Sequence, residues 1–467
     1  MTELTELSAG RRNFADYYTN PYKQITHIGD PFILYDEDTK KYYMYCTGGY
    51  FKCWSSDTMK TWTEHGNAYT VTDKSFGTQK YWAPEVYKYG GAYYMVYSAA
   101  NAGNRHSIGL AKSNSPTGPF TDIYDHPLFS PGYSVIDASL FFDTDGRVYL
   151  YYSRDCSENY VNGKRTSQVY GVELKADLSG AIGEPALLAT PTDPWELQSG
   201  SVIWNEGPCV FRRGDVYYLL YTANYYASAS YSVGYATSNA PLGVYTKSKD
   251  NPILVGDGKY TSGTGHCNIT RSPDGSEMYM VYHSHTDVTN TTNPIADRTP
   301  CVDKLVIRAD GSPRYSMTCM LIGAGSLYKK YAGVEISSTY TAVAGNPENL
   351  VDEVVPHAGM SDRDLYQFEA GGGYIRIGYD KAINLNSLWI YGVSHAALSP
   401  KTVYAVVNGR YQTKVKAFTT SMPMTPVVIT ADMLPASAAV SDIRLYFEGG
   451  DGSSTIALGE IITVIRT

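Results

Sequence analysis

The sequence predicts an all-β protein, with a five-bladed β-propeller over residues 1–325 and a smaller β-sandwich of the jelly-roll type over residues 332–467. Three observations predict this fold. A strand–turn–strand segment occurs five times in the first two thirds of the chain, helical periodicity is nearly absent, and short strands separated by Gly, Pro, Asn and Asp continue toward the C-terminal end. Strand-built repeats of this kind are typical of propeller blades.

Each copy of the repeat opens with one strand and returns along a second strand that is rich in tyrosine. The copies open at Asp30, Ala83, Asp137, Glu206 and His266, in steps of 53, 54, 69 and 60 residues, and the Tyr-rich strands follow at residues 42–45, 93–97, 148–152, 216–221 and 278–282. A strand, a short polar turn and a second strand form a β-hairpin. Because equivalent positions of propeller blades converge on the axis, we expect Asp30, Asp137, Glu206 and His266 to meet in one central pocket.

The remainder of each repeat predicts two further strands. Residues 107–120 match residues 232–245 closely, and both segments run from a strand through a Pro/Gly turn into an outer strand. Pro and Gly at such positions mark turns rather than strand interiors. We therefore expect roughly four strands in each blade.

A different all-β unit is predicted after residue 313, where the repeat stops. Residues 322–331 are the expected junction, and strands are expected at residues 374–379, 388–391, 403–407, 427–429 and 443–447. Gly, Pro, Asn and Asp turns separate them. Short strands at this spacing over about 130 residues fit a β-sandwich.

The composition excludes some classes of function. The 467 residues carry a net charge of −8, and no basic cluster occurs, which argues against nucleic-acid binding. No apolar run approaches the length of a membrane span. Residues 1–23 lack the apolar stretch of a signal peptide, so we expect a cytoplasmic protein or an exported one whose signal peptide is absent from this sequence. The seven cysteines form no close metal-binding pair and are expected to be buried and reduced.

Three of the five openings carry a carboxylate, at Asp30, Asp137 and Glu206. Hydrolysis of a glycosidic bond needs one carboxylic acid that protonates the leaving oxygen and one carboxylate on the other side of the sugar. The acid must stay protonated although a free Glu titrates near pH ~4.3, and a second carboxylate nearby raises its pKa by repulsion. Three acids can therefore serve as base, acid and modulator of the acid's pKa. Their order in the sequence leaves open which is which.

The motifs of the first 315 residues resemble those of one enzyme family. Asp-Pro at 30–31, Trp-Ala-Pro-Glu at 82–85, Ile-Asp at 136–137, Glu-Gly-Pro at 206–208, Gly-His at 265–266 and Arg-Thr at 298–299 occur in the order seen in glycoside hydrolase family 43. The resemblance covers about residues 25–315. That family consists of five-bladed β-propellers, mostly inverting α-L-arabinofuranosidases, β-xylosidases and arabinanases.

The resemblance implies a role for each carboxylate. Asp30 would be the general base that activates water, and Glu206 would be the general acid. Asp137 would tune the pKa of the acid and help to orient the substrate. Glu85 lies beyond the opening of its copy and is expected to face away from the axis or to bond to backbone.

The resemblance also implies residues that bind the substrate. His266 would lie on the floor of the pocket, where the family uses this histidine to hold a water or, in some members, a calcium ion. Arg298 would pair with the sugar or with the acid side of the site, and Trp82 would present its ring to the sugar. His283 and His285 are expected to be structural or to lie at the rim. No nucleotide, redox or zinc motif occurs, so no cofactor is expected, apart from calcium in a structural site or at the propeller axis.

The C-terminal unit has a weaker resemblance of its own. Residues 344–352 and 374–379 resemble discoidin-like (galactose-binding-like) jelly rolls. Such modules often bind glycans, and others only brace the domain beside them. Both roles stay open for residues 332–467.

We therefore expect an exo-acting, inverting glycosidase that removes arabinofuranosyl or xylosyl units from plant-type oligosaccharides or polysaccharides. One alternative is a galactan- or arabinan-cleaving hydrolase with the same fold. Another is a non-catalytic glycan-binding propeller, although such a protein has no need of three converging carboxylates. The sequence leaves open the sugar, the linkage, exo or endo action and the oligomeric state.

Overall fold

The structure, a computed structural model, describes residues 22, 24–256, 261–288, 297–308, 310–316, 328–354, 364–393, 398, 400–409, 411–416, 427–430, 439–449 and 454–466. The chain divides into two compact units, of which one is Thr19–Asp303 and the other contains Lys304–Thr467. In the described residues the regular structure is strand except for two short 3₁₀ helices, η2 (Pro194–Glu196) and η3 (Pro347–Leu350). The prediction of an all-β chain is confirmed. The predicted domain boundary between residues 325 and 332 stays a prediction.

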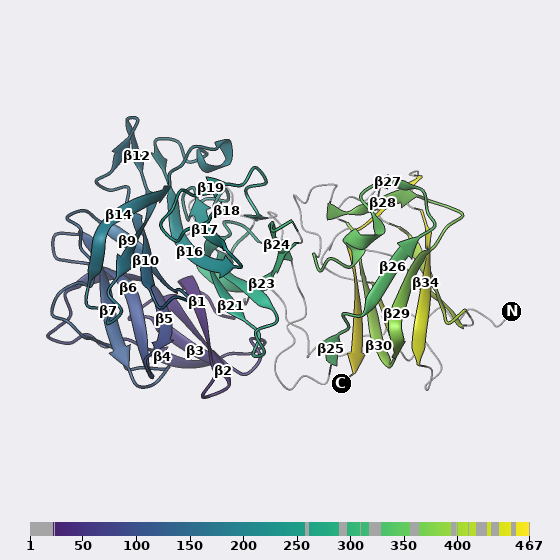
Figure 1. Cartoon of the computed structure of the whole chain (residues 1–467), viewed down its shortest axis with the longest axis horizontal. Helices are drawn as coiled ribbons and strands as arrows, with labels where there is room; N and C mark the ends of the chain where they lie inside the picture. Colours follow the sequence, from purple (N-terminus) through teal and green to yellow (C-terminus); the bar gives the residue numbers. More distant parts are fainter. Residues whose placement is uncertain are drawn as a thin grey trace. The chain divides into compact units, whose positions relative to one another are not determined.

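Five antiparallel sheets follow one another along the first part of the chain (Figure 1). Sheet 1 contains β1 (Gly29–Asp36), β2 (Lys41–Thr47), β3 (Lys52–Ser56) and β4 (Thr63–Asn67), and sheet 2 contains β5 (Gln79–Tyr89), β6 (Ala92–Ala100), β7 (His106–Ser113) and β8 (Thr121–Asp122). Sheet 3 contains β9 (Val135–Phe142), β10 (Val148–Arg154), β13 (Gln168–Leu174) and β14 (Ala181–Ala189). Each sheet begins with the predicted hairpin and adds the two further strands.

Sheets 4 and 5 repeat this order. Sheet 4 contains β16 (Asn205–Arg213), β17 (Val216–Ala223), β18 (Ser232–Ser238) and β19 (Thr246–Lys247), and β20 (Leu254–Val255) also pairs with β18. Sheet 5 contains β21 (Gly265–Arg271), β22 (Met278–His285), β23 (Arg298–Ile307) and β24 (Pro313–Ser316). A small sheet of β11 (Tyr160–Val161), β12 (Lys164–Thr166) and β15 (Val202–Ile203) lies apart from the five.

The Tyr-rich second strands form the core between the sheets. Separate apolar clusters join sheet 1 to sheet 2, sheet 2 to sheet 3 and sheet 3 to sheet 4. Tyr45, Tyr97, Tyr151 and Tyr221 are fully buried in these clusters. Each of these phenols donates a hydrogen bond, to the carbonyl of Pro116, to Asp122, to the carbonyl of Pro241 and to Glu196, respectively. Tyrosine therefore supplies a large apolar face while its hydroxyl remains satisfied, which explains its abundance in these strands.

A β-bulge occurs at the same place in the first strand of all five sheets. The residues paired just before the bulge are Gly29–Thr47, Trp82–Ser98, Ile136–Ser153, Glu206–Thr222 and Gly265–His283. The residue that follows has a positive φ in each case: Asp30 (52°), Ala83 (48°), Asp137 (58°), Gly207 (56°) and His266 (50°). We call these five the bulge residues. A bulge re-aims a side chain relative to its sheet. Glu206 therefore lies one residue before the position that Asp30, Asp137 and His266 share, so the expected equivalence of the four openings is corrected by one residue.

Five hydrogen bonds connect these bulges from sheet to sheet. The backbone N–H of each bulge residue donates to a side chain at the end of the preceding sheet's second strand: Ala83 to Thr47 (2.7 Å), Asp137 to Ser98 (2.9 Å), Gly207 to Ser153 (3.1 Å), His266 to Thr222 (2.9 Å) and Asp30 to Nδ1 of His283 (3.3 Å). The last bond runs from sheet 1 to sheet 5. The first strands also contact one another in the order β1, β5, β9, β16, β21, and β21 contacts β1.

The C-terminal unit contains three sheets. The first contains β25 (Tyr328–Lys330), β36 (Glu460–Arg466), β30 (Leu385–Tyr391) and β33 (Val427–Thr430). The second contains β26 (Val334–Ser338), β29 (Ile375–Ile383), β34 (Val440–Glu448), β31 (Thr402–Val407) and β32 (Tyr411–Lys416). The third contains β27 (Ala342–Ala344), β28 (Tyr366–Glu369) and β35 (Thr455–Leu458). All five strands predicted for this unit occur within one or two residues of an observed strand end or inside an observed strand. Most of their inward residues form one large buried apolar cluster. The jelly-roll and discoidin-like predictions for this unit stay predictions.

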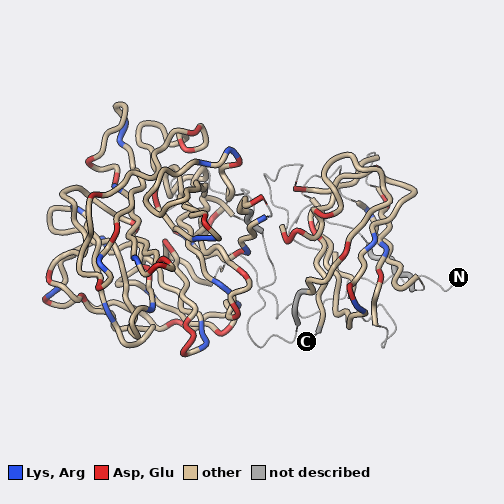
Figure 2. Tube along the Cα trace, viewed as in Figure 1, with Lys and Arg blue, Asp and Glu red and all other residues tan. Residues whose placement is uncertain are grey.

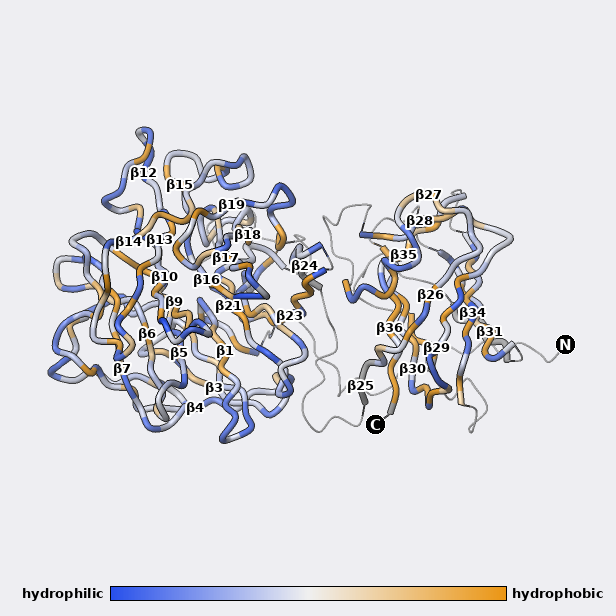
Figure 3. Tube along the Cα trace, viewed as in Figure 1, coloured by the Kyte–Doolittle hydropathy of each residue, from blue (hydrophilic) through white to orange (hydrophobic). Residues whose placement is uncertain are grey.

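The distribution of side chains separates core from surface in both units. Apolar stretches follow the strands, and polar stretches follow the connections (Figure 3). Lys and Arg are intermixed with Asp and Glu along the described trace (Figure 2). No helix in the described ranges is long and apolar enough to cross a membrane. The six cysteines within those ranges are buried and free, whereas Cys319 and most of the predicted junction lie outside them.

Candidate active site

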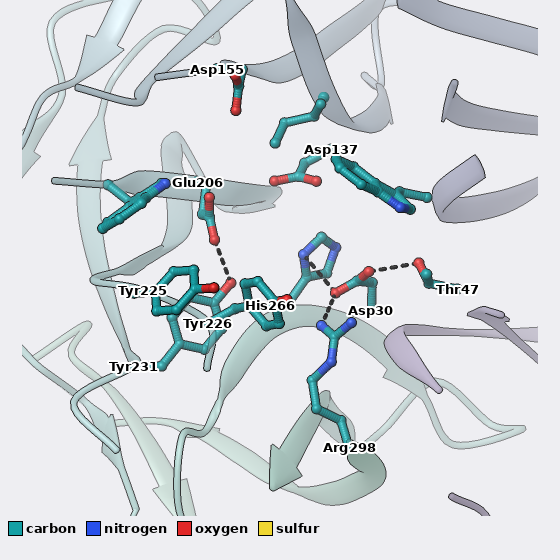
Figure 4. Close-up of a pocket in the computed structure, with 13 residues that line it drawn as sticks. Asp30, Thr47, Asp137, Asp155, Glu206, Tyr225, Tyr226, Tyr231, His266 and Arg298 are labelled. Atoms are coloured by element: carbon teal, nitrogen blue, oxygen red, sulfur yellow. Dashed lines mark hydrogen bonds and ion pairs between the residues drawn. The ribbon is translucent and has the colours of Figure 1, made fainter. Parts of the chain in front are cut away.

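One cavity of about 270 Å³ gathers the residues that the sequence analysis selected (Figure 4). Its lining contains Asp30, Thr47, Trp82, Ile136, Asp137, Asp155, Trp204, Glu206, Tyr225, Tyr226, Tyr231, His266 and Arg298. All six predicted site residues are in this set, and they come from all five sheets. The bulges explain the convergence, because each turns the start of a first strand toward the same space.

Asp30 is surrounded by hydrogen-bond donors. Its Oδ1 accepts from Nη1 of Arg298 at 2.8 Å, and its Oδ2 accepts from the hydroxyl of Thr47 at 2.6 Å. The Thr47 hydroxyl already accepts the Ala83 N–H, so its single proton is directed to Asp30. Burial raises the pKa of Asp30, but the charges of Arg298 and His266 and the Thr47 bond outweigh burial and hold that pKa well below its usual range. Asp30 is therefore ionised at neutral pH.

Glu206 has a different environment. Its Oε1 accepts one hydrogen bond, from the hydroxyl of Tyr231 at 2.9 Å. Burial, and after it the negative charge of Asp137, raises the pKa of Glu206 well above its usual range, and the bond from Tyr231 only partly opposes this. Asp155, which also lines the cavity, adds a further negative charge nearby. The surroundings of Glu206 therefore favour its protonated form.

Asp137 lines the same cavity and accepts two hydrogen bonds on Oδ2. The donors are the N–H of Gly207 at 3.1 Å and the hydroxyl of Ser153 at 3.3 Å. Burial raises the pKa of Asp137, with the charge of Asp30 adding to it and His266 and the two donors opposing it. Because Asp137 has two donors on its carboxylate and Glu206 has one, we assign the proton of this pair to Glu206.

The two histidines beside Asp30 have separate tasks. Nδ1 of His266 lies 3.5 Å from Oδ1 of Asp30 at the pocket lining. His283 is fully buried, and its Nδ1 accepts the backbone N–H of Asp30, so that nitrogen carries no proton. Burial lowers the pKa of His283 well below its usual range, so its 3.6 Å approach to the Asp30 carboxylate is not an ion pair. This agrees with the structural role expected for His283.

Two glycines leave room for the side chains that hold the carboxyl groups. A Cβ on Gly29 would collide with the guanidinium of Arg298, and a Cβ on Gly265 would collide with the ring of Tyr231. Arg298 holds Asp30, and Tyr231 holds Glu206. Arg298 was expected to pair with the sugar or with the acid side. Its carboxylate partner is Asp30 rather than Glu206, because Gly29 opens the space beside Asp30, and its pairing with the sugar stays a prediction.

Aromatic rings form much of the remaining wall. Trp82 is stacked on His106, with the ring centroids 4.3 Å apart. Trp204 lies against Tyr225 at 5.4 Å, and Tyr226 contacts both Tyr225 at 4.9 Å and the guanidinium of Arg298 at 4.9 Å. Flat apolar rings beside polar groups suit the faces of sugar rings.

Glu85 lies outside this lining. It is buried, and its oxygens accept hydrogen bonds from Nδ2 of Asn268 at 2.6 Å and from the hydroxyl of Tyr87. Its partners are thus side chains rather than backbone. Burial raises the pKa of Glu85 to about 8.

Metal binding finds no support in the described part of the chain. No group of three or more His, Cys, Asp or Glu residues there is arranged to hold a metal ion. The calcium predicted at His266 stays a prediction.

Sequence reasoning missed the residues that support the carboxyl groups and the wall beside Glu206. The sequence did carry a signal for the residues that accept the bulge N–H groups. Each predicted Tyr-rich segment is followed within two residues by a side chain able to accept a hydrogen bond: Thr47, Ser98, Ser153, Thr222 and His283. No comparable repeat marks Tyr231, Tyr225 or Trp204, which lie in or beside connections of sheet 4.

The chain is similar to known glycosidases. It matches the model of glycosyl hydrolases family 43 over residues 18–313. It is 28% identical over 328 residues to a β-D-galactofuranosidase of Aspergillus niger, covering 66% of this chain and 85% of that protein. It is 25% identical over 248 residues to an extracellular exo-α-(1→5)-L-arabinofuranosidase of Streptomyces avermitilis, covering 50% of each.

A solved structure agrees with these relatives. The crystal structure of a thermostable family-43 glycoside hydrolase superposes with a TM-score of 0.62 and 43% sequence identity, covering 66% of this chain and 99% of that one. The family model spans more than half of the 467 residues and contains every residue that lines the cavity. The chain belongs to glycosyl hydrolase family 43 and is a glycoside hydrolase.

Proposed function

We propose that the chain is an exo-acting, inverting glycosidase that removes single arabinofuranosyl or xylosyl units from plant-type oligosaccharides or polysaccharides. One observation carries the proposal: a carboxyl group with a lowered pKa and another with a raised pKa line the same cavity. Two carboxyl groups whose environments drive their pKa values apart are the expected pair of base and acid.

In this proposal Asp30 is the general base and Glu206 the general acid. Asp30 takes a proton from a water molecule as the oxygen of that water attacks the anomeric carbon. The bond from that carbon to the leaving oxygen breaks, and Glu206 gives its proton to this oxygen. Asp137 keeps the pKa of Glu206 high through its negative charge and contributes to the orientation of the sugar. His266 and Arg298 hold Asp30 in its ionised form.

The size of the cavity supports removal of one sugar at a time. Its volume of about 270 Å³ is just below the roughly 300–1,000 Å³ typical of pockets for larger ligands. Such a volume suits one or two sugar rings better than a long polysaccharide segment. The relative from Streptomyces avermitilis is an exo-acting arabinofuranosidase, which supports the same assignment.

A second candidate substrate is a β-D-galactofuranoside. The relative from Aspergillus niger, which this chain matches over 85% of that protein's length, is a β-D-galactofuranosidase. Arabinofuranosides and galactofuranosides share a five-membered sugar ring. The same base and acid would act on either, so the wall of the pocket must decide between them.

We also propose that the five sheets are the blades of a closed propeller and that the five hydrogen bonds between bulges and neighbouring sheets fix the blades around the axis. The cycle of contacts among β1, β5, β9, β16 and β21 supports this arrangement. The C-terminal unit is proposed as a β-sandwich that binds carbohydrate or braces the propeller.

The proposed function is tested with aryl glycosides of α-L-arabinofuranose, β-D-xylose and β-D-galactofuranose. The wild type is expected to hydrolyse at least one of them, and Glu206→Gln and Asp30→Asn are expected to lose that activity while they stay folded. NMR of the first product formed is expected to show the inverted anomer. First appearance of the retained anomer would overturn the inverting mechanism, and mixed oligomers early in the digestion of arabinan would overturn exo action.

A further inference from the structure

We propose that Trp204 and Tyr225 form a rigid aromatic platform that binds the sugar ring of the leaving group and so selects which linkages are cleaved. The ligand class is a pentose or hexose ring joined through the glycosidic oxygen, with one apolar face turned to the platform. This inference rests on the proposed role of Glu206 as the general acid. It goes further by assigning the leaving-group side of the site to named residues.

The position of the two rings supports the proposal. Both line the cavity, and Trp204 precedes Glu206 by two residues in the chain. Figure 4 shows Tyr225 on the same side of the pocket as Glu206, whereas Asp30 and Thr47 lie on the opposite side. In inverting hydrolysis the water enters on the side of the base and the leaving group departs on the side of the acid. Rings beside Glu206 therefore meet the leaving group.

The two rings offer a surface for stacking. Their centroids are 5.4 Å apart, and their planes are inclined by 33°. Both residues are only partly buried and line the cavity, so part of each ring is open to a ligand. Aromatic rings bury large apolar area and cost little conformational entropy on binding, because they have few rotatable bonds.

Asn224 makes this platform rigid. This residue is fully buried with a φ of 76°, a backbone conformation that non-glycine residues seldom adopt. Its side-chain amide donates to the carbonyls of Trp195 (2.7 Å) and Ser230 (3.0 Å), and its oxygen accepts the N–H of Gln198 (3.0 Å). These bonds fix the strained backbone immediately before Tyr225.

Two further bonds attach the platform residues themselves. The N–H of Tyr225 donates to the hydroxyl of Ser199 at 3.0 Å, and the N–H of Asn224 approaches the carbonyl of Trp204 at 3.4 Å. The segments that carry the two rings are thus bonded to each other before any ligand arrives. A surface that is already ordered loses less entropy on binding a sugar.

Tyr226 is the neighbouring ring that does not belong to the platform. Its ring contacts the guanidinium of Arg298, which holds Asp30, and its carbonyl accepts a hydrogen bond from His285 at 2.9 Å. Tyr226 is therefore tied to the base side of the pocket. Adjacent tyrosines serve opposite sides of the same site.

The test compares two substrates that contain the same reacting sugar, such as methyl α-L-arabinofuranoside and α-(1→5)-arabinobiose. The reacting sugar is chosen first, as the one whose aryl glycoside the wild type hydrolyses fastest. The methyl glycoside has a similar alkoxide leaving group but no ring to place on the platform. Tyr225→Ala and Trp204→Ala are each expected to lower kcat/KM for the disaccharide by about tenfold, the effect of a lost aromatic contact, and to leave the methyl glycoside within about twofold of the wild type.

Tyr225→Phe is the matched control, because it retains the ring and is expected to keep both activities. Circular dichroism checks that each variant is folded at the assay temperature. An equal loss on both substrates, or no loss on either, would overturn the platform. If the wild type hydrolyses neither substrate and no aryl glycoside, the proposed function itself fails. That failure is distinguishable from failure of the platform proposal, because it is seen with the wild type before any variant is compared.

Discussion

The two sides of the pocket bury their carboxyl groups to a similar degree but surround them differently. The Asp30 side chain is 12% exposed and the Glu206 residue as a whole is 8% exposed, and burial raises the pKa of both. Asp30 faces a guanidinium, a histidine and a hydroxyl donor, whereas Glu206 faces one phenol and the charge of Asp137. Burial therefore does not decide which group carries a proton at neutral pH. The charge of the neighbours decides it.

A glycine at the same position of two sheets makes room for the side chain that contacts each carboxyl group. Gly29 and Gly265 are equivalent residues of sheets 1 and 5, and each leaves space that a longer side chain occupies. Arg298 fills the space beside Gly29, and Tyr231 fills the space beside Gly265. A repeated scaffold thus gives one carboxyl group a lowered pKa and another a raised pKa because the side chains that fill the two spaces differ: Arg298, the first residue of β23, and Tyr231, the residue before β18.

Asp30→Asn tests the base side and should have the largest effect. An amide cannot accept the proton of the attacking water, so kcat should fall by about 10³-fold or more on every substrate. The loss should not depend on the leaving group, because the base acts on the water. Kinetics with a series of substituted aryl glycosides checks this, with the folded fraction measured separately, since Arg298 loses its charged partner. A loss that varies steeply with the leaving group would assign Asp30 to the acid side.

Glu206→Gln is the matching change on the acid side. We expect a loss of roughly 10²–10⁴-fold on substrates whose leaving group needs a proton. With a strongly acidic leaving group such as 2,4-dinitrophenol the loss should shrink markedly, because such a group departs without protonation. The same aryl series measures this dependence. Identical leaving-group profiles for Glu206→Gln and Asp30→Asn would remove the distinction between the two sides.

Some residues of this site could be predicted from the sequence, and others could be identified only from the structure. The Tyr-rich repeat predicts the hairpins, and it places Asp30, Asp137 and His266 at equivalent positions. It misplaces Glu206 by one residue. The bulge residue of sheet 4 is Gly207, which precedes Pro208 as Asp30 precedes Pro31 and Ala83 precedes Pro84. The family resemblance, not the repeat, selects Arg298.

Some of the residues that the sequence analysis missed could have been recognised from the sequence, and others could not. Thr47 and Ser153 follow Tyr-rich segments of the repeat, so the sequence shows that they occupy similar positions. It does not show which groups they bond to. Tyr231, Tyr225 and Trp204 depend on how the connections of sheet 4 fold over the pocket. Connections carry no periodic pattern, and so their contacts cannot be derived from spacing.

Thr47→Val tests two roles of one hydroxyl: its bond to the base Asp30, and its bond to the backbone of Ala83, which forms the joint between sheets 1 and 2. The change removes the hydroxyl that donates to Asp30 and accepts from Ala83. Because the Thr47 bond lowers the pKa of Asp30, its loss should raise that pKa and shift the acidic limb of the kcat/KM profile to higher pH. The unpaired N–H of Ala83 should cost about 1–3 kcal/mol of unfolding free energy.

Thr222→Val is the control for this change. Thr222 makes the equivalent joint by accepting the N–H of His266, and no bond from its hydroxyl to a pocket carboxyl group accompanies that joint. It should lose similar stability, measured by urea unfolding, while its acidic limb stays at the wild-type pH. An acidic limb that moves equally in both variants would show that the joint, and not the Thr47 donor, sets the pKa of the base.

Glu85→Gln should affect activity least, and it extends the comparison beyond the pocket. Glu85 is buried with neutral partners and no cation, as Glu206 is, and its pKa is raised from 4.5 to about 8. A group that binds its proton more tightly in the folded state stabilises the protein fully below its unfolded pKa and loses that contribution as the pH rises to about 8. The wild type should therefore lose more apparent Tm between pH 5 and pH 9 than Glu85→Gln, which has no proton to lose. Both proteins retain Glu206 and Asp137, so the difference between their Tm changes belongs to Glu85. Equal changes would mean that burial among neutral hydrogen-bond partners does not raise the pKa of Glu85, even with the charge of Asp137 adding to it, and burial would then not account for the raised pKa of Glu206.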